Sequence, residues 1–365
     1  MSIRLLHLAD LHLGATGRLT GEVGDARRQD FIKAFDAAVA FARAPDTRVD
    51  AVLICGDLFD THTPAADLVT LVQARFEGLR EDGIPVLLVP GFRDAFVYPD
   101  SVYRTNPLGA QLLLSPQRPV TLELGGTAVH FYGCAWLSRQ SGVGALQRQD
   151  LPGFHVGLLH GHVGAPEPAP FHFTVSELEA TALDYVALGG HRAGLELRSG
   201  NPAVVYAGSL EEAGSEGGGF LVATLEGPNQ VSLARTPYAG RPVLHLTVDL
   251  TPLDLQGGSP ALSSYLLRHA APSALCRLEL TGSAPFVIDV GALQALLSSH
   301  FFHLEVVDRT RFSQAQVIRG LEAEATVRGG FTRQVMAALR KGEDETALEH
   351  ALKAVLKPCL EEELL

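Results

Sequence analysis

Short apolar runs alternate with helical patterns over the first ninety-odd residues, and this alternation restricts the fold more than any other feature. We predict strands before Asp10, over Val52–Cys55 and over Ile84–Val89, with helices over about Asp25–Ala44 and Pro64–Arg80 between them. Such an order is typical of an α/β layer with parallel strands, in which ligands collect outside the C-terminal strand ends. The ends of these strands are therefore the first place to look for function.

Each of these strands ends in a turn that carries acidic residues, and two later strands end in histidines. The turns are Asp10-Leu11-His12, Gly56-Asp57-Leu58-Phe59-Asp60, Gly91-Phe92-Arg93-Asp94, His160-Gly161-His162 and Gly190-His191-Arg192. Carboxylate oxygens and imidazole nitrogens are the usual ligands of Mn, Fe and Zn. One isolated Asp-x-His is more often a cap beside a surface histidine. Five such strand ends in one alternating chain instead predict a divalent-metal site.

The middle of the chain is predicted to be richer in strands. A hairpin is expected around Gly125-Gly126, and a short helix over Ser176–Leu183 carries the Ser176/Glu179 capping-box pattern. Strands are predicted over Val120–Leu124, Thr127–Gly133, Phe154–Leu159, Asp184–Leu188, Val204–Tyr206, Phe220–Leu225 and Gln230–Ala234. We expect the last three to form a second sheet that closes this domain.

A composition shift at Arg241-Pro242 marks a new region. Strands and helices alternate again from His245 to Val307, which predicts a small α/β unit. From Gly330 the pattern is helical, and Leu348, Leu352, Val355 and Leu356 form an apolar stripe. The stripe either packs on its own domain or binds a partner. We therefore predict domains over 1–237 and 241–312, and a helical segment over 313–365.

Composition places the chain among globular proteins, with 46% hydrophobic and 19% charged residues. The absence of a signal-peptide pattern and of an apolar run of ~18 residues predicts a cytoplasmic protein without a membrane span. The four cysteines are far apart and form no C-x-x-C pair, as expected for reduced residues. The net charge of −12 argues against strong unaided binding to nucleic acid but leaves room for a local basic patch.

The motifs together resemble those of a known family. The matching segments are Asp10-Leu11-His12-Leu13-Gly14, Gly56-Asp57-Leu58-Phe59-Asp60, Leu158-Leu159-His160-Gly161, Asp184-Tyr185-Val186-Ala187-Leu188-Gly189 and Tyr206-Ala207-Gly208-Ser209-Leu210-Glu211. The chain resembles calcineurin-like metallophosphoesterases, and among them the SbcD/YhaO family of DNA repair exonucleases, over about residues 1–235. The resemblance implies an α/β fold: a β-sandwich flanked by helices, with a small α/β cap domain and a helical C-terminal tail.

The resemblance also implies two-metal phosphodiester hydrolysis with Mn as the expected cofactor. Asp57 would be the bridging ligand, because a carboxylate can touch both ions. Asp10 and His12 would belong to the first metal and His160 to the second. Asp57, His160 and Arg93 would be the catalytic residues.

Two motifs depart from the family pattern. The third, Gly-Asn-His-Asp, here reads Gly91-Phe92-Arg93-Asp94, so a metal donor is lost and Arg93 cannot release a proton. The fifth, Gly-His-x-His, here contains Gly190-His191-Arg192 and lacks at least one ligand. His191 or the additional His162 would be the substitute ligands. Arg93 and Arg192 could instead hold DNA phosphate. We expect one ion rather than two, and weak or absent hydrolysis.

Three functions remain open from the sequence. The first is an SbcD-like DNA phosphodiesterase whose C-terminal helices bind an SbcC-like coiled-coil ATPase, with a homodimer as a further assembly. The second is a catalytically decayed subunit that binds DNA ends or the ATPase partner. The third is a phosphatase for small phosphoesters, because one fold serves many substrates. His7, within the first strand, is interpreted as a core or edge histidine, and Trp136 as a core residue.

Overall fold

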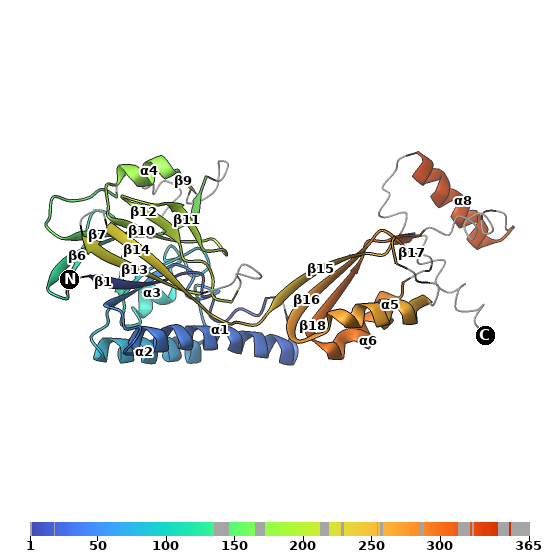
Figure 1. Cartoon of the computed structure of the whole chain (residues 1–365), viewed down its shortest axis with the longest axis horizontal. Helices are drawn as coiled ribbons and strands as arrows, with labels where there is room; N and C mark the ends of the chain where they lie inside the picture. The colour runs from blue at the N-terminus through green and yellow to red at the C-terminus, as the bar shows by residue number, and fades with distance from the viewer. Residues whose placement is uncertain are drawn as a thin grey trace. The chain divides into compact units, whose positions relative to one another are not determined.

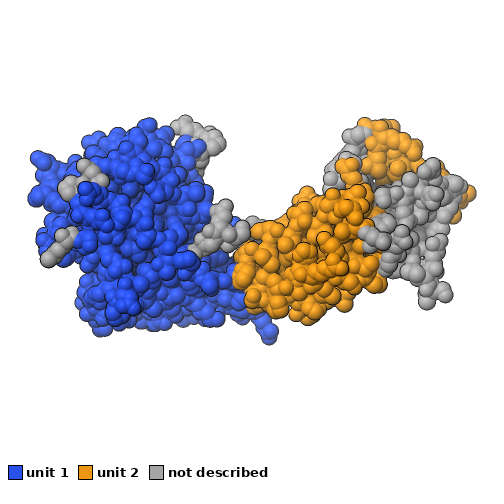
Figure 2. Space-filling model, in the orientation of Figure 1, with its two compact units in different colours: residues 1–241 blue, residues 242–365 orange. Residues whose placement is uncertain are grey.

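A computed structural model of the chain divides into two compact units, Met1–Arg241 and Pro242–Leu365, which are coloured separately in Figure 2. The residues described are 2–17, 19–134, 146–164, 172–211, 219–227, 230–253, 255, 258–284, 286, 288–312, 322, 325–341 and 350–351. Trp136 and the predicted stripe from Leu348 to Leu356 lie outside these residues, apart from His350 and Ala351.

The first unit contains two six-stranded sheets (Figure 1). The first sheet has the order β14-β13-β1-β2-β3-β4 and the second β11-β12-β10-β7-β6-β5. The strands of the first sheet are β1 (Ile3–Leu8), β2 (Ala51–Cys55), β3 (Val86–Val89), β4 (Gln111–Leu112), β13 (Gly219–Gly227) and β14 (Gln230–Pro237). Those of the second are β5 (Val120–Leu124), β6 (Thr127–Gly133), β7 (Phe154–His160), β10 (Tyr185–Gly189), β11 (Leu195–Arg198) and β12 (Ala203–Tyr206). A separate pair consists of β8 (His162–Val163) and β9 (His172–Phe173).

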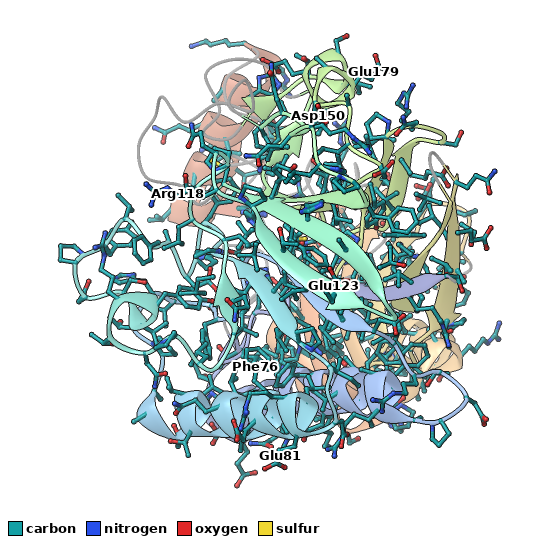
Figure 3. The ribbon with its side chains drawn as sticks, turned by 90° about the vertical axis from the view of Figure 1, so that its left-hand side faces the viewer. Phe76, Glu81, Arg118, Glu123, Asp150 and Glu179 are labelled. Carbon is teal, nitrogen blue, oxygen red and sulfur yellow. The ribbon has the colours of Figure 1, made fainter. Side chains whose placement is uncertain are left out.

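Helices cover the outer face of the first sheet. The helices of this unit are α1 (Gly21–Arg43), α2 (Ala66–Glu81), α3 (Val102–Thr105) and α4 (Val175–Ala180). Phe35 of α1 meets Phe76 of α2 edge to face, with ring centroids 6.0 Å apart. Figure 3 shows Phe76 pointing from α2 toward the sheet, whereas Glu81 at the end of the helix points away. The apolar stripes of α1 and α2 therefore face the first sheet, as helix periodicity requires.

The two sheets pack on each other because successive strand residues face opposite sides. Leu6 and Leu8 of β1 belong to the core beneath α1 and α2. Leu5 instead belongs to the core between the sheets, together with Phe131 and Tyr185 of the second sheet. A further core on the outer face of the second sheet includes Leu178 of α4. The unit is thus a β-sandwich flanked by helices, as predicted.

Parallel register brings the strand ends together. Leu8 of β1 pairs with Ile54 of β2, and Cys55 of β2 pairs with Val89 of β3. In the second sheet, His160 of β7 pairs with Gly189 of β10. The turns that follow these strands therefore begin at nearly the same level of each sheet.

Several predicted details were wrong. Strands β12, β13 and β14 do not form a sheet of their own: β12 pairs in parallel with β10, whereas β13 pairs with β1 in antiparallel register and with β14. The edge of the first parallel layer, which would otherwise be unpaired, is thereby covered. The capping box of α4 is formed by Thr174 and Glu177 rather than by Ser176 and Glu179. Helix α1 begins at Gly21, earlier than predicted.

The second unit contains a three-stranded sheet of order β15-β16-β18, in which both pairings are parallel. Its regular elements are β15 (Val243–Asp249), α5 (Gly258–Leu266), η3 (Leu267–His269), β16 (Ala271–Thr281), β17 (Ser283–Ala284), α6 (Val290–Leu297), η4 (Ser298–His300), β18 (Phe301–Asp308), β19 (Arg311–Phe312) and α8 (Val327–Arg340). Leu262 and Leu293 of the two helices share one core with Leu278 of β16. Within the described parts of both units, no helix is both long and apolar enough to cross a membrane.

Candidate metal centre

The turns after β1 and β2 hold three candidate ligands in an unusual backbone conformation. Asp10, His12 and Asp57 have φ angles of 51°, 44° and 52°, a region that residues other than glycine seldom occupy. Each such residue costs on the order of 1–3 kcal/mol and persists only where its surroundings impose it. Here the two turns are bonded to each other, since His12 N–H donates to the carbonyl of Asp57 at 2.9 Å and Asp10 N–H to that of Gly56 at 3.1 Å.

Asp10, Asp57 and His160 converge at this point. One donor atom from each lies within 4.8 Å of the other two, and all three residues are buried. His160 comes from the second sheet, so the group joins both sheets. Its Nδ1–H donates to the Cys55 carbonyl at 2.9 Å, which leaves Nε2 as the acceptor nitrogen. Nε2 is buried without a hydrogen-bond partner among the described residues and lies 3.6 Å from Asp57 Oδ2.

The electrostatics of this group fit a bound cation. Burial raises the pKa of Asp10, and the charge of Asp57 raises it further, against the lowering effect of His160. For His160, burial lowers the pKa, but the charges of Asp57, Asp10 and Asp94 and the hydrogen bond to the Cys55 carbonyl together raise it overall. Two buried carboxylates beside an imidazole nitrogen that has no hydrogen-bond partner in the described part of the chain are the donor set that Mn, Fe or Zn prefers. A divalent ion would neutralise the two carboxylates and bind that nitrogen.

Backbone groups orient the two carboxylates. Gly190 N–H donates to Asp10 Oδ2 at 2.9 Å, and Arg93 N–H donates to Asp57 Oδ1 at 2.8 Å. Ser209 Oγ–H donates to the Asp10 carbonyl at 2.9 Å. Gly91 is required at its position, because a Cβ there would lie 2.1 Å from Asp57 Oδ1. These are the outer contacts that fix the orientation of metal ligands.

Asp94 supports the site from behind. It accepts hydrogen bonds from Gly91 N–H at 2.7 Å, from Phe59 N–H at 3.2 Å and from Tyr103 O–H at 2.6 Å. Burial, together with the nearby charge of Asp57, raises the pKa of Asp94 to about 6. Asp94 therefore joins the turn that follows β2 to the turn that follows β3.

His12 lies beside the group formed by Asp10, Asp57 and His160. Its Nε2 is 4.0 Å from Asp57 Oδ2, and its Nδ1 is 3.5 Å from Asp60 Oδ1. Asp60 is thus placed to orient His12, in the way that carboxylates commonly orient ligand histidines.

The aromatic ring of Phe92 packs against the imidazole of His160. Its ring meets the His160 ring edge-on with centroids 4.7 Å apart, and it stacks on His162 with centroids 5.8 Å apart. The place of a metal-binding asparagine is therefore filled by an aromatic ring. Neither His162 nor His191 joins the group of Asp10, Asp57 and His160 within the described residues. His191 is exposed, with Nδ1 3.0 Å from the Ala193 carbonyl and its ring near Tyr206. Their ligand roles stay predictions.

The two arginines lie at the rim. The Arg93 side chain is 63% exposed, with Nε 4.0 Å from Asp60 Oδ1, and Arg192 is also exposed. Sequence reasoning missed the contributions of Gly190 N–H, Ser209 and Tyr103. Ser209 lies in a segment that carries the family resemblance, whereas Tyr103 has no motif around it and no sequence signal.

Fold and site define a metal-dependent phosphoesterase. The sequence profile of the calcineurin-like phosphoesterases matches residues 3–192, and the chain belongs to that family. It is 25% identical over 240 residues to the uncharacterized metallophosphoesterase YhaO of Bacillus subtilis, covering 59% of this chain and 56% of YhaO. It is 27% identical over 327 residues to the SbcD component of the nuclease SbcCD of Rhodobacter capsulatus, covering 80% and 76% of the two chains. It is also 27% identical over 298 residues to the DNA double-strand break repair protein Mre11 of Halobacterium salinarum, covering 78% and 72%.

Proposed function

We propose that the chain is an SbcD-like phosphodiesterase that hydrolyses DNA slowly, with Mn as its metal. The observation that carries the proposal is the buried group of Asp10, Asp57 and His160, in which His160 Nε2 has no hydrogen-bond partner among the described residues. The similarity to the SbcD component of SbcCD and to Mre11 supports DNA as the substrate.

Each residue of the site has a definable task. A bound divalent ion would activate a water molecule and offset charge on the phosphate oxygens. Asp57 is the central ligand, because its carboxylate lies next to both His12 and His160. Asp10 completes the group, and the Gly190 N–H keeps its carboxylate directed inward. Arg93 and Arg192 would hold phosphate at the rim through guanidinium donors.

The weakness of the reaction follows from the third motif. Phe92 contributes no donor atom beside His160, so we expect one ion rather than two. Arg93 supplies positive charge but no proton at neutral pH, because its guanidinium stays protonated. Without a second ion and a proton donor, the leaving oxygen receives little assistance.

The partners and location are part of the proposal. We expect DNA, an SbcC-like coiled-coil ATPase bound by the C-terminal helices, and a homodimer, in the cytoplasm. The net charge of −12 supports a partner that contributes to DNA binding, since phosphates favour basic surfaces.

A second candidate is a decayed subunit that binds DNA ends or the ATPase without hydrolysis. The contact of Phe92 with both His160 and His162 favours it, because aromatic packing beside the ligand nitrogen opposes entry of a second ion.

Elemental analysis of bound Mn after saturation and desalting, with Asp57→Ala in parallel, tests the proposal first. We expect one ion per wild-type chain, none in Asp57→Ala, and slow Mn-dependent cleavage of DNA by the wild type only. Binding of DNA without cleavage would favour the second candidate. Hydrolysis of bis(p-nitrophenyl) phosphate without cleavage of DNA would favour a phosphatase for small phosphoesters. Absence of bound Mn would contradict the proposed enzyme.

A further inference from the structure

A cavity of about 580 Å³ opens next to the metal centre, between α1, α2 and the two metal turns. Leu13 and Gly14, which directly follow His12, form one wall, and Asp60 and Thr61 form another. Asp60 lines the cavity and also lies beside the metal centre, since its Oδ1 is 3.5 Å from His12 Nδ1. A ligand in this cavity would therefore be a direct neighbour of a group held at the metal centre.

The lining of the cavity combines an apolar floor with a polar rim. The half-buried Ile32 of α1 and Leu71 of α2 line the cavity with Leu68, which is 8% exposed, whereas Leu13 also lines it but offers no accessible surface. Arg28, Asp60 and Asp67 belong to the polar part of the lining. A flat ring could lie on the aliphatic floor while its edge meets these charged groups.

We propose that this cavity takes up one unpaired nucleobase of a DNA strand whose phosphate lies at the metal centre. This inference rests on the proposed function and specifies its substrate as single-stranded at this point. The rim carries two carboxylates, Asp60 and Asp67, and one guanidinium, Arg28, so it is unfavourable for a negatively charged phosphate. The nucleobase is therefore the part of the DNA strand that fits the cavity. Unpaired bases are commonly held in pockets by hydrogen bonds to their edges and by apolar contacts to their faces.

Guanine matches the rim better than thymine does. Its N1–H and N2–H groups are donors for a carboxylate such as Asp67, and its O6 and N7 atoms are acceptors for Arg28. Thymine offers one ring N–H and two carbonyl acceptors, and therefore gives a carboxylate less to bind. We expect dG to be preferred over dT at the position whose base enters the cavity.

The test measures binding of the full chain to fluorescent single-stranded oligonucleotides by anisotropy, with Ca²⁺ in place of Mn²⁺ to prevent cleavage. A single abasic site is moved along a strand of mixed sequence that is just long enough to fill the binding site, so that the strand cannot shift its register. In the wild type we expect one position at which the missing base weakens binding about tenfold, because stacking and edge contacts of one base contribute on that order. Restoring dG at that position should strengthen binding more than restoring dT.

Gln29→Trp serves as the cavity-filling variant. Gln29 is exposed on α1 and lines the cavity, so an indole there fills the space without disturbing the core. We expect this variant to lose the effect of the abasic position while keeping the Mn content of the wild type. Ala74→Trp, at an exposed position of α2 outside the cavity, is the matched control and should keep the effect. Asp67→Asn should reduce the preference for dG.

The outcomes separate this inference from the proposed function. Base-dependent binding without cleavage supports the cavity and contradicts the phosphodiesterase. Cleavage of DNA with equal affinity for intact and abasic strands overturns the cavity alone, and a wild-type chain that binds no strand overturns both. Conversion of a dimer to a monomer by Gln29→Trp, measured by light scattering, with base dependence unchanged, would show that a second copy of the chain covers the cavity instead.

Discussion

The ring of Phe92 lies edge-on against the imidazole of His160, with centroids 4.7 Å apart and planes inclined by 75°. His160 is also held by the hydrogen bond from its Nδ1–H to the Cys55 carbonyl at 2.9 Å. The imidazole is therefore fixed between a hydrogen bond and an aromatic ring, and its Nε2 faces Asp57. This geometry keeps the candidate ligand nitrogen beside Asp57, with carbon atoms in the neighbouring position.

Replacing Phe92 by asparagine tests whether this ring limits the metal content. We expect Phe92→Asn to bind more Mn per chain than the wild type and to cleave DNA at least about tenfold faster, because a carbonyl donor replaces a ring. Elemental analysis and a cleavage assay measure the two effects. Phe92→Ala provides space without a donor and should bring no gain; equal Mn content in Phe92→Asn and Phe92→Ala would refute the idea.

We expect the Asp10 carboxylate to destabilise the folded chain without metal and to stabilise it with bound metal. Burial raises its pKa, so the ionised carboxylate is unfavourable in the folded, metal-free chain. Asp10→Asn keeps an acceptor for Gly190 N–H but removes the buried charge. With EDTA at pH 7 the variant should melt a few degrees above the wild type, since about 1 kcal/mol corresponds to roughly 2–4 °C in a domain of this size. Added Mn should raise the melting temperature of the wild type only, as scanning calorimetry would show.

His7 should make the protein sensitive to mild acid. It is fully buried, accepts from Tyr185 O–H at 2.8 Å through Nδ1 and donates to the Leu188 carbonyl at 3.1 Å through Nε2. Burial lowers its pKa to about 3 from the usual 6.5. Below pH 6.5, His7 therefore binds a proton in the unfolded chain but stays neutral in the folded chain. The stability of the folded state consequently falls as the pH falls through this range.

Between pH 7 and pH 5 the loss from His7 is roughly 2 kcal/mol, at 1.36 kcal/mol for each pH unit below 6.5. Urea unfolding at the two pH values measures it. His7→Gln, which does not titrate, should flatten this dependence, whereas His245→Gln at an exposed position should not. The same slope in the wild type and His7→Gln would exclude His7 as the cause.

A buried ion-pair network joins α1 to the end of the first unit. Arg27 donates to a Glu211 carboxylate oxygen and, at 2.9 Å, to the Glu211 carbonyl, and both residues are 4% exposed. Arg241 contacts Asp30 of the same helix at 2.6 Å. The segment that leads into the second unit is thus anchored to α1.

Arg27→Met should destabilise the chain by about 3–5 kcal/mol, because it leaves the Glu211 carboxylate buried without its guanidinium. The double variant Arg27→Met/Glu211→Leu should recover most of this loss, since no unpaired charge remains. Arg75→Met, which removes a largely exposed contact with Asp36, is the control and should change stability little. Guanidinium unfolding gives all three values; a double variant no better than Arg27→Met would argue against the charge as the cause.

The sequence alone predicts the local parts of this protein well, because they depend on local patterns. Apolar runs of strand length are followed by acidic turns, and the hairpin Val120–Leu124 with Thr127–Gly133 is observed as predicted. The proximity of Asp10 and Asp57 also follows from pattern, since parallel strands of one sheet place their C-terminal ends at one edge, whereas His160 reaches them from the second sheet. His7 was interpreted as a core or edge histidine from its position in a strand, and it is buried.

Only the tertiary structure decided which sheet each late strand joins and what surrounds the ligands. An antiparallel strand such as β13 can pair with any open edge, and its residues alone do not select β1. Phe92 contacts His160, and Gly190 N–H donates to Asp10, although the two residues of each pair are distant in the chain. Nothing in the residue types predicts either contact. The sequence by itself determined where the candidate ligands lie along each strand. The packing of two sheets determined which of them meet, because that depends on distances that no local pattern contains.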